Sequence, residues 1–124
     1  MEELYLKEDV YKIIGFCKEV SKILGKGHRE IIYGNALDYK FNKVKIPFNR
    51  EMTFHISYKN IILSHYYYSD FVIFDEIILE IKAITELSNR AIKQILNYLA
   101  APKNKLRLLM NFGEGSLKYR RIIF

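Results

Sequence analysis

Three residues near the middle of the chain, Asp70, Glu80 and Lys82, are of the types that can hold a divalent cation and act on a phosphate group. Two carboxylates that converge in a partly dry place repel each other and are costly unless a cation lies between them. A hard ion such as Mg²⁺ accepts a small number of carboxylates, keeps several waters and leaves room for phosphate oxygens. The residue types therefore indicate metal-assisted chemistry, provided that the fold brings the two acids together.

The stretch between the two acids predicts how they meet. Phe71 to Phe74 and Ile77 to Leu79 are β-branched and aromatic runs typical of a buried sheet, and Asp75-Glu76 favours a short turn. A turn there brings Asp70 back beside Glu80. Since side chains alternate along a strand, Glu80 and Lys82 share one face and Ile81 points to the other. The alternative is that both acids are solvated turn and edge residues and that Lys82 is a surface lysine, although acids inside apolar runs need a reason to be there.

The length and composition of the chain exclude several classes of protein. We expect one domain over residues 1–124, and half of the residues are hydrophobic, which argues against disorder. No apolar run approaches the roughly 20 residues of a membrane-spanning helix, and the first ten residues are acidic rather than signal-like. The single cysteine, Cys17, excludes an internal disulfide and a thiolate zinc site, and its apolar neighbours place it in the core. We expect a soluble, intracellular (cytoplasmic) protein.

The formal charge is +6, and the excess lies mostly at the C-terminal end. The segment 103–124 holds six basic residues against Glu114 alone. This distribution suits a polyanionic partner such as nucleic acid. A basic end strand is also a common protection against aggregation at a sheet edge, so both interpretations stay open.

Periodicity gives the order of the elements that must position the three residues. Apolar residues at helical spacing predict a helix over residues 7–24, ended by Gly25, and a second helix from near Gly27 that stops before Pro47. The alternation from Met52 to Tyr58 predicts a strand with one wet face, and 59–60 turn the chain into residues 61–63 and the central hairpin. Ser88 can cap a helix that Pro102 closes, and strands over 106–112 and 117–124 follow. Strands that bracket a helix predict a mixed sheet covered by helices, an α/β sandwich.

An Asp, nine mostly apolar residues and then Glu-x-Lys resembles the active-site signature of the PD-(D/E)XK nuclease superfamily. The resemblance implies a restriction-endonuclease-like αβββαβ core, which agrees with the predicted order of elements. Gly27, Glu30 and Tyr33 further resemble the Gly-x-x-Glu-x-x-Tyr motif of the GxxExxY family, a branch of this superfamily.

Three more stretches carry the likeness, which runs from about Cys17 to the C-terminus. Residues 80–84, EIKAI, resemble the family's ELKAV, and 111–113 resemble its Asn-Phe-Gly. Gln94 and Tyr98 give the Gln-x-x-x-Tyr pattern of RecB-like and lambda-exonuclease-like members. One departure is Tyr68, which stands where the family usually has an arginine two positions before the metal-binding Asp. A phenol lacks the charge and the bidentate fork of a guanidinium.

The resemblance implies a divalent-metal-dependent nuclease acting on DNA. Asp70, Glu80 and Glu30, with the backbone carbonyl of Ile81, would hold Mg²⁺ or Mn²⁺, and Lys82 would orient or deprotonate the attacking water. The expected catalytic residues are Asp70, Glu80 and Lys82, and the expected contacts to substrate are Gln94, Tyr98, Tyr33 and Tyr68. By analogy with small nucleases of this fold we expect a homodimer.

Other interpretations stay open. Glu30, in the first turn of its helix, could simply complement the helix N-terminus, and Gln94 with Tyr98 could be half-buried packing residues. His28, His55 and His65 form no recognisable ligand set, and Gly25 with Gly27 lacks the third glycine and preceding strand of a dinucleotide loop. The alternative function is a non-catalytic nucleic-acid-binding or assembly module that keeps the nuclease fold. A third is a scaffold that dimerises through exposed apolar surface and binds no nucleic acid.

Overall fold

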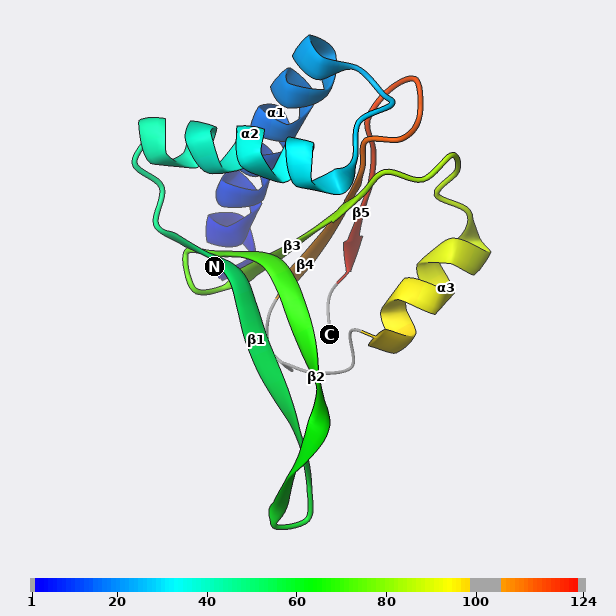
Figure 1. Ribbon diagram of the computed structural model, residues 1–124. Helices are drawn as coiled ribbons and strands as arrows, with labels where there is room; N and C mark the ends of the chain where they lie inside the picture. The colour runs from blue at the N-terminus through cyan, green and yellow to red at the C-terminus, as the bar shows by residue number, and fades with distance from the viewer. Residues whose placement is uncertain (1, 99–105, 123–124) are drawn as a thin grey trace.

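The computed structural model describes residues 2–98 and 106–122, apart from the side chains of 2–6, 65–67 and 96–98. Its elements follow the predicted order, two helices, three strands, a helix and two strands (Figure 1): α1 Glu2–Leu24, α2 Glu30–Lys43, β1 Phe48–Tyr58, β2 Ile61–Ile73, β3 Ile77–Lys82, α3 Asn89–Tyr98, β4 Leu106–Asn111 and β5 Lys118–Ile122. The closure of α3 at Pro102 and the last two residues of the predicted final strand lie outside the described residues.

The described strands form one five-stranded sheet in the order β1-β2-β3-β4-β5. β1, β2 and β3 form an antiparallel meander, β3 pairs with β4 in parallel, and β4 pairs with β5 antiparallel. The parallel pair requires a crossover, which α3 provides. The mixed sheet that we expected is therefore confirmed.

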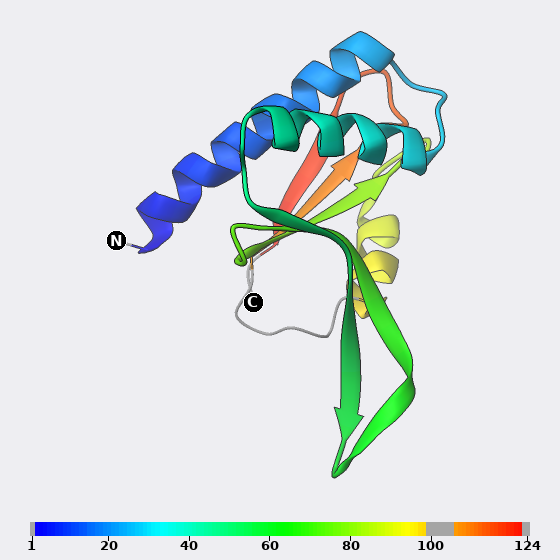
Figure 2. The same ribbon diagram turned by 60° about the vertical axis from the view of Figure 1, so that its left-hand side comes forward.

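Helices α1 and α2 cover one face of the sheet, and α3 lies on the opposite side (Figure 2). The core fills the space beneath α1 and α2, where Ile13 and Cys17 of α1 and Leu37 and Phe41 of α2 are fully buried. The predicted apolar sides of the helices are confirmed in large part, but Ile23, Ile32 and Val44 are exposed. All three residues lie in, or directly next to, the first or last turn of a helix.

Alternation along β3 divides its side chains between the two faces. Ile77, Leu79 and Ile81 belong to the core beneath α1 and α2, so Ile78, Glu80 and Lys82 face the side of α3. On β2, Phe71 and Ile73 are in the same core, which puts Asp70 on the face of Glu80 and Lys82. The prediction that Ile81 points away from Glu80 and Lys82 is confirmed.

The far part of the β1–β2 pair is a two-stranded ribbon that leaves the sheet (Figure 1). β3 pairs with β2 only along residues 71–73, so within the described sheet residues 52–69 of β1 and β2 pair only with each other, and we call this segment the arm. From His55 to Tyr58 every residue of β1 is exposed. The prediction that only one face of this strand is exposed to solvent was therefore wrong. Alternating apolar residues form a buried face only where another layer of the fold covers that face.

The turn between β2 and β3 lies one residue earlier than predicted. Phe74 and Asp75 are its central residues, both with positive φ (54° and 57°), and the Glu76 N–H donates to the Ile73 carbonyl over 3.1 Å. A two-residue turn of this handedness matches the twist of the strands, although it normally selects Asn-Gly. The β2–β3 hairpin itself is confirmed.

The C-terminal charge is only partly on the surface. Lys118, Arg120 and Arg121 are exposed on β5, but Arg107 of β4 is 1% exposed. It is buried because β4 lies between two strands and is covered on both faces. Lys103 and Lys105 lie outside the described residues. None of the described helices is long and apolar enough to cross a bilayer.

Candidate active site

Asp70 and Glu80 meet across the β2–β3 pair. The register places Phe71 opposite Leu79, and one more step in the same register puts Asp70 opposite Glu80. Beyond that step the Asp70 carboxylate reaches across the strands, where its Oδ2 accepts a hydrogen bond of 2.7 Å from the Ile81 N–H. A side-chain hydrogen bond also joins Asp70 to Glu80. The two acids are therefore neighbours, as the spacing in the sequence predicts.

The two acids of the site lie in a partly buried place. Glu80 is 6% exposed, and Asp70 and Lys82 are half-buried. Burial raises the pKa of Asp70 above its ordinary value, although the Ile81 N–H, the Lys82 ammonium, the hydrogen bond to Glu80 and the Arg50 guanidinium each lower it. Since two carboxyl groups can hydrogen-bond to each other only through a proton, this pair favours either a proton or a cation between its oxygens.

Glu30 comes to the same end of β3 from the opposite helix layer. It is the first residue of α2, and its Oε2 accepts a 3.1 Å hydrogen bond from the Ala83 N–H, directly after Lys82. An acid in this position also complements the partial positive charge of the helix N-terminus. Glu30 thus fastens α2 to the strand that carries Glu80 and Lys82.

Tyr33 is a buried support and lies out of reach of solvent. Its ring is fully buried and stacks on Phe112 with centroids 4.5 Å apart, and its hydroxyl donates to the Gly25 carbonyl over 2.6 Å. The same hydroxyl accepts a 3.3 Å hydrogen bond from the His28 N–H. Tyr33 therefore shapes the loop that leads into Glu30, which is a different task from the substrate contact that we expected.

Asn111 fixes the chain just beyond Lys82. Its Oδ1 accepts from the backbone N–H of Ile84 (2.9 Å), and its Nδ2 donates to the Ile84 carbonyl (3.0 Å) and to Glu114 Oε2 (2.9 Å). Gly113 packs so tightly that a Cβ there would collide with the Ile84 backbone. The Asn-Phe-Gly stretch thus holds the end of β3 in place, which keeps Lys82 beside the acids.

The donor set fits a divalent ion that keeps part of its water shell. Among the described residues no group of three or more His, Cys, Asp or Glu side chains is gathered as a ready ligand cage. Mg²⁺ needs only one or two carboxylates and completes its octahedron with water and substrate oxygens. Asp70 and Glu80 supply that pair of carboxylates. The carboxylate of Glu30, the third expected ligand, is instead hydrogen-bonded to the Ala83 N–H over 3.1 Å.

A family model described as the PD-(D/E)XK nuclease superfamily matches residues 7–122. The chain belongs to the PD-(D/E)XK nuclease superfamily. Comparisons with curated proteins and with solved structures gave no match. The observed order of helices and strands and the mixed sheet agree with the restriction-endonuclease-like fold of the superfamily, so the expected fold class is confirmed. Members of the superfamily generally use divalent metals.

The other residues expected at the superfamily site are less closely gathered. Gln94 is exposed on α3, and Tyr98 ends α3 with a side chain outside the described residues. Tyr68 is 56% exposed and lies two residues before Asp70, which puts it on the same face of β2. Tyr68 is therefore available to a ligand approaching Asp70. Gln94 lies on α3, the helix on the same side of the sheet as Asp70.

Arg50 is a charged residue near Asp70 that the sequence analysis missed, and its side chain lies toward α2, where it pairs with Asp38. It lies on β1 opposite Phe71, one residue from Asp70 in the ladder, and its charge lowers the pKa of Asp70. Nothing local in the sequence marks it, since it precedes the alternating run from Met52 and lies 20 residues before Asp70. Only the pairing of β1 with β2 reveals the proximity.

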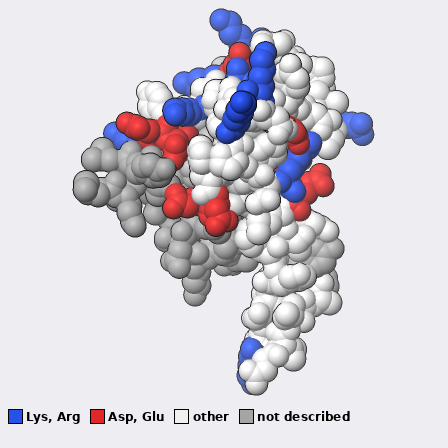
Figure 3. All heavy atoms as spheres, turned by 90° about the vertical axis from the view of Figure 1, so that its left-hand side faces the viewer, with Lys and Arg blue, Asp and Glu red and all other residues white. Residues whose placement is uncertain are grey.

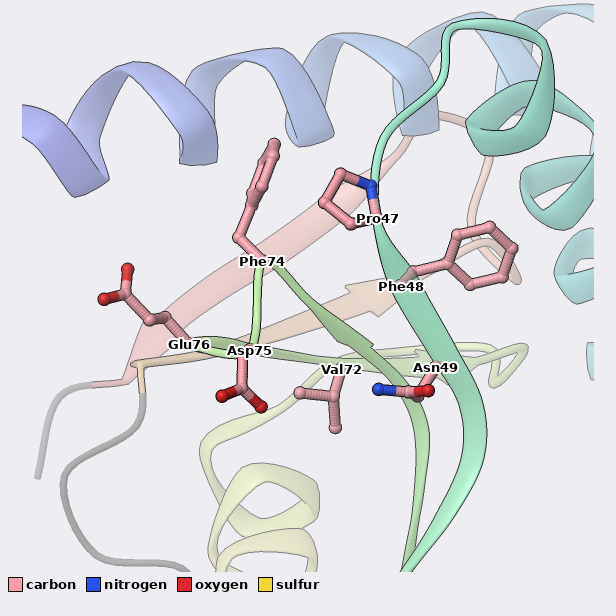
Figure 4. Close-up of a pocket in the computed structure, with 7 residues that line it drawn as sticks. All are labelled: Pro47, Phe48, Asn49, Val72, Phe74, Asp75 and Glu76. Atoms are coloured by element: carbon pink, nitrogen blue, oxygen red, sulfur yellow. The ribbon is translucent and has the colours of Figure 1, made fainter.

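A shallow hollow of about 600 Å³ lies at the other end of the β2–β3 pair (Figure 4). It is lined by Pro47, Phe48, Asn49, Val72, Phe74, Asp75 and Glu76. In the close-up Phe74 points toward α1 while Asp75 and Val72 point to the opposite side. None of the residues predicted for the superfamily site lines this hollow.

Proposed function

We propose that the protein is a nuclease that hydrolyses phosphodiester bonds in DNA with Mg²⁺ or Mn²⁺. The observation that carries the proposal is the meeting of Asp70 and Glu80 across the β2–β3 pair, with Asp70 bonded to the Ile81 N–H, Glu80 buried and Lys82 on the same face of β3. The superfamily match supports it. Within the superfamily, the Gly27, Glu30 and Tyr33 motif favours the GxxExxY branch.

Each residue has a task that follows from its position. Asp70 and Glu80, with the Ile81 carbonyl, would hold the ion. Glu30 would become a further ligand once its hydrogen bond with the Ala83 N–H is broken. When bound, such an ion polarises the scissile phosphate and lowers the pKa of a bound water. Lys82 would orient or deprotonate that water and offset the negative charge that develops on the phosphate. Gln94, Tyr68 and Tyr98 remain our candidates for contact with the DNA.

The test is cleavage of plasmid, linear duplex, single-stranded DNA and RNA in Mg²⁺ or Mn²⁺. We expect cleavage by the wild type, a loss of about 100-fold or more in rate for Asp70→Asn and Glu80→Gln, and a similar loss for Lys82→Met with metal binding retained. Asp75→Asn, Glu76→Gln and Lys12→Met are matched controls, since they change the same residue types at exposed places away from the site. Wild-type and variant proteins that cleave equally would exclude the proposal.

The alternative function, a binding module without chemistry, predicts a different result. Such a protein would bind DNA with a strong salt dependence and cleave none of the four substrates in either metal. The exposed basic residues Lys118, Arg120 and Arg121 on the edge strand β5 are the observation that keeps this alternative in the test.

We also propose that the protein pairs with a second copy of itself through the arm. Half of the large hydrophobic residues that are exposed in the described structure lie there: Met52, Ile56, Tyr58, Ile61, Ile62, Leu63 and Tyr68. An isolated two-stranded ribbon is marginally stable in water, which favours a cover. The arm holds one charged residue, Lys59, and Figure 3 shows it as an almost uncharged projection. An uncharged apolar surface does not suit a polyanion, whereas the arm of a second copy matches it in chemistry.

A further inference from the structure

Two exposed basic residues of β5, Lys118 and Arg120, lie on the face of the sheet that carries the candidate site. On β4, Leu109 and Asn111 face the side of α3, because the residues before and after each of them belong to the core beneath α1 and α2. The β4–β5 register pairs Leu109 with Arg120 and Asn111 with Lys118, and residues that pair directly share a face. Lys118 and Arg120 are therefore on the side of the two acids.

The contacts of β5 with the helices support this assignment. Arg120 Nη2 donates to Asn89 Oδ1, at the start of α3, over 3.2 Å, and Figure 1 shows α3 beside β5. Tyr119 faces the other way, since the Lys18 ammonium of α1 lies 5.9 Å from the centroid of the Tyr119 ring. By the same alternation Arg121, which is also exposed, lies on the side of α1. The two neighbouring arginines of β5 thus belong to opposite faces.

Through β4, the register connects β5 to the candidate site. Arg120 lies in line with Glu80, and Lys118 lies in line with Lys82, each two strands away. Because neighbouring strands are about 4.8 Å apart, the backbone positions in each line are about 10 Å apart. One strand of duplex DNA advances about 3.4 Å per nucleotide along the helix axis, so this separation corresponds to about three nucleotides. A strand with one phosphate at the acids therefore has further phosphates within reach of β5.

The segment between β3 and α3 runs in the same direction across the sheet. Ile84 is hydrogen-bonded to Asn111 on β4, and Asn89 is hydrogen-bonded to Arg120 on β5. A nucleic-acid strand that extends from the candidate site to β5 therefore passes over residues 84–89. The exposed charged residues described along this path are Glu86, Arg90, Lys118 and Arg120, and three of them are basic.

The charges of Lys118 and Arg120 are not balanced by an acid in the described part of the chain. Arg120 is bonded there to the neutral amide of Asn89, and Lys118 makes no ion pair there. A guanidinium has five donors, so Arg120 can keep its bond to Asn89 and still bind an anion. The two acids of the site repel a polyanion, which favours cations on the same face. The two basic residues of β5 supply such cations.

We propose that Lys118 and Arg120 bind phosphates of the nucleic-acid strand that is cleaved, a few nucleotides away from the scissile bond. The inference rests on the proposed nuclease function and adds the path that the substrate takes across the sheet. The competing account is that the basic residues of β5 only protect the edge of the sheet from pairing with another chain. A protected edge needs charge on β5 but does not depend on the face that carries it, so Arg120 and Arg121 would then be equivalent.

A metal-free binding measurement separates the two accounts. In EDTA, the fluorescence anisotropy of labelled duplex and single-stranded DNA is followed as NaCl is raised. Loss of one phosphate contact lowers the slope of log Kd against log salt by about 0.9 on a duplex and by about 0.7 on a single strand. We expect this decrease for Arg120→Gln and for Lys118→Gln, and about twice the decrease for the double variant. Arg121→Gln and Lys12→Gln, which remove the same charges on the α1 side, should keep the wild-type slope.

Cleavage kinetics in Mn²⁺ connect β5 to the candidate site. Arg120→Gln should raise KM for DNA about tenfold, because one charged contact to the substrate is lost. Its kcat should stay within about twofold of the wild type, since β5 does not touch the scissile phosphate. Arg120→Lys keeps the charge and should keep the wild-type salt slope. Melting temperatures of all variants, which change exposed side chains, should match that of the wild type.

The outcomes distinguish this inference from the nuclease proposal. A wild type that cleaves nothing, with a lower slope for Arg120→Gln than for Arg121→Gln, would refute the nuclease proposal and leave the α3 side of β5 as a phosphate-binding surface. Equal slopes for Arg120→Gln and Arg121→Gln would overturn the inference even if the wild type cleaves DNA. A wild type that binds neither DNA in EDTA would overturn it as well.

Discussion

At the scale of single residues, the proposed chemistry depends on Asp70, an acid that the fold makes costly to ionise. Burial raises its pKa, while one N–H, one neighbouring acid and two basic side chains partly offset that effect. A pKa that is higher in the folded state than in the unfolded state stabilises the fold at low pH, and this contribution is lost as pH rises through the folded pKa. Metal-free protein at neutral pH therefore carries a destabilising charge that an ion would relieve.

We predict that Asp70→Asn raises the melting temperature of the protein in EDTA at pH 7 by a few degrees. Asparagine can still accept from the Ile81 N–H and can donate to Glu80 without a shared proton. The gain should shrink as the pH falls, because Asp70 of the wild type then takes up a proton and loses the buried charge. Melting curves from pH 4 to pH 8 measure this, and adding Mn²⁺ should stabilise the wild type and not the variant.

Glu76→Gln is the control for this comparison, because its side chain is exposed in the β2–β3 turn and its φ is not positive. It should leave the melting temperature unchanged at every pH. A gain for Asp70→Asn that is the same at pH 4 and at pH 7 would contradict the burial of the charge as its cause.

At the scale of elements, the candidate site depends on two connections. One is the β2–β3 turn, which brings the two acids together, and the other is the loop after β3, which is hydrogen-bonded to Asn111. The turn accepts strain at Phe74 and Asp75, both non-glycine residues with positive φ. The loop is fixed by hydrogen bonds from Asn111 and by the close approach of Gly113. The turn determines the register of Asp70 against Glu80, and the loop determines the position of Lys82.

Asp75→Gly should stabilise the protein by about 0.5 kcal/mol, because glycine adopts positive φ without the steric cost of a Cβ. Glu76→Gly, in the same turn without a positive φ, should instead destabilise it by about 0.5–1 kcal/mol. Urea unfolding of the two variants compares them directly. If both substitutions shift stability in the same direction, the strain assigned to Asp75 is wrong.

Gly113→Ala should cost about 1–3 kcal/mol of stability, because the new methyl group meets the backbone of Ile84, which cannot turn away as a side chain would. Gly115→Ala is a matched control, since nothing lies within 4 Å of a Cβ at that position. Urea unfolding measures both. Equal effects of the two substitutions would show that the contact at Gly113 does not fix the end of β3.

At the scale of the whole molecule, the arm is the feature that the fold itself does not use. It extends from the sheet without a covering layer and carries apolar residues on its surface. The compact part of the described structure keeps its own large core beneath α1 and α2. The arm can therefore serve association without being needed for the core.

Ile62→Asp should convert a dimer into a monomer, since Ile62 is 68% exposed on the arm and a carboxylate there would be buried in a paired interface. Sedimentation velocity at micromolar concentrations measures the change. Ile31→Asp, at an exposed position of α2, should leave the assembly as it is. A wild type that sediments as a monomer at all concentrations would exclude pairing through the arm.

The sequence by itself determined the β2–β3 hairpin and which of its side chains share a face. The spacing of Asp70, Glu80 and Lys82 in apolar runs was enough to predict which side chains share a face, because alternation is a local property of strands. Helix ends at Gly25 and before Pro47 followed from local backbone preferences. Only the tertiary structure decided that Arg50 lies near Asp70, that Tyr33 is buried beneath the site and that the arm is uncovered. Each of these depends on which distant segments pack together, and a pattern of neighbours along the chain does not encode that.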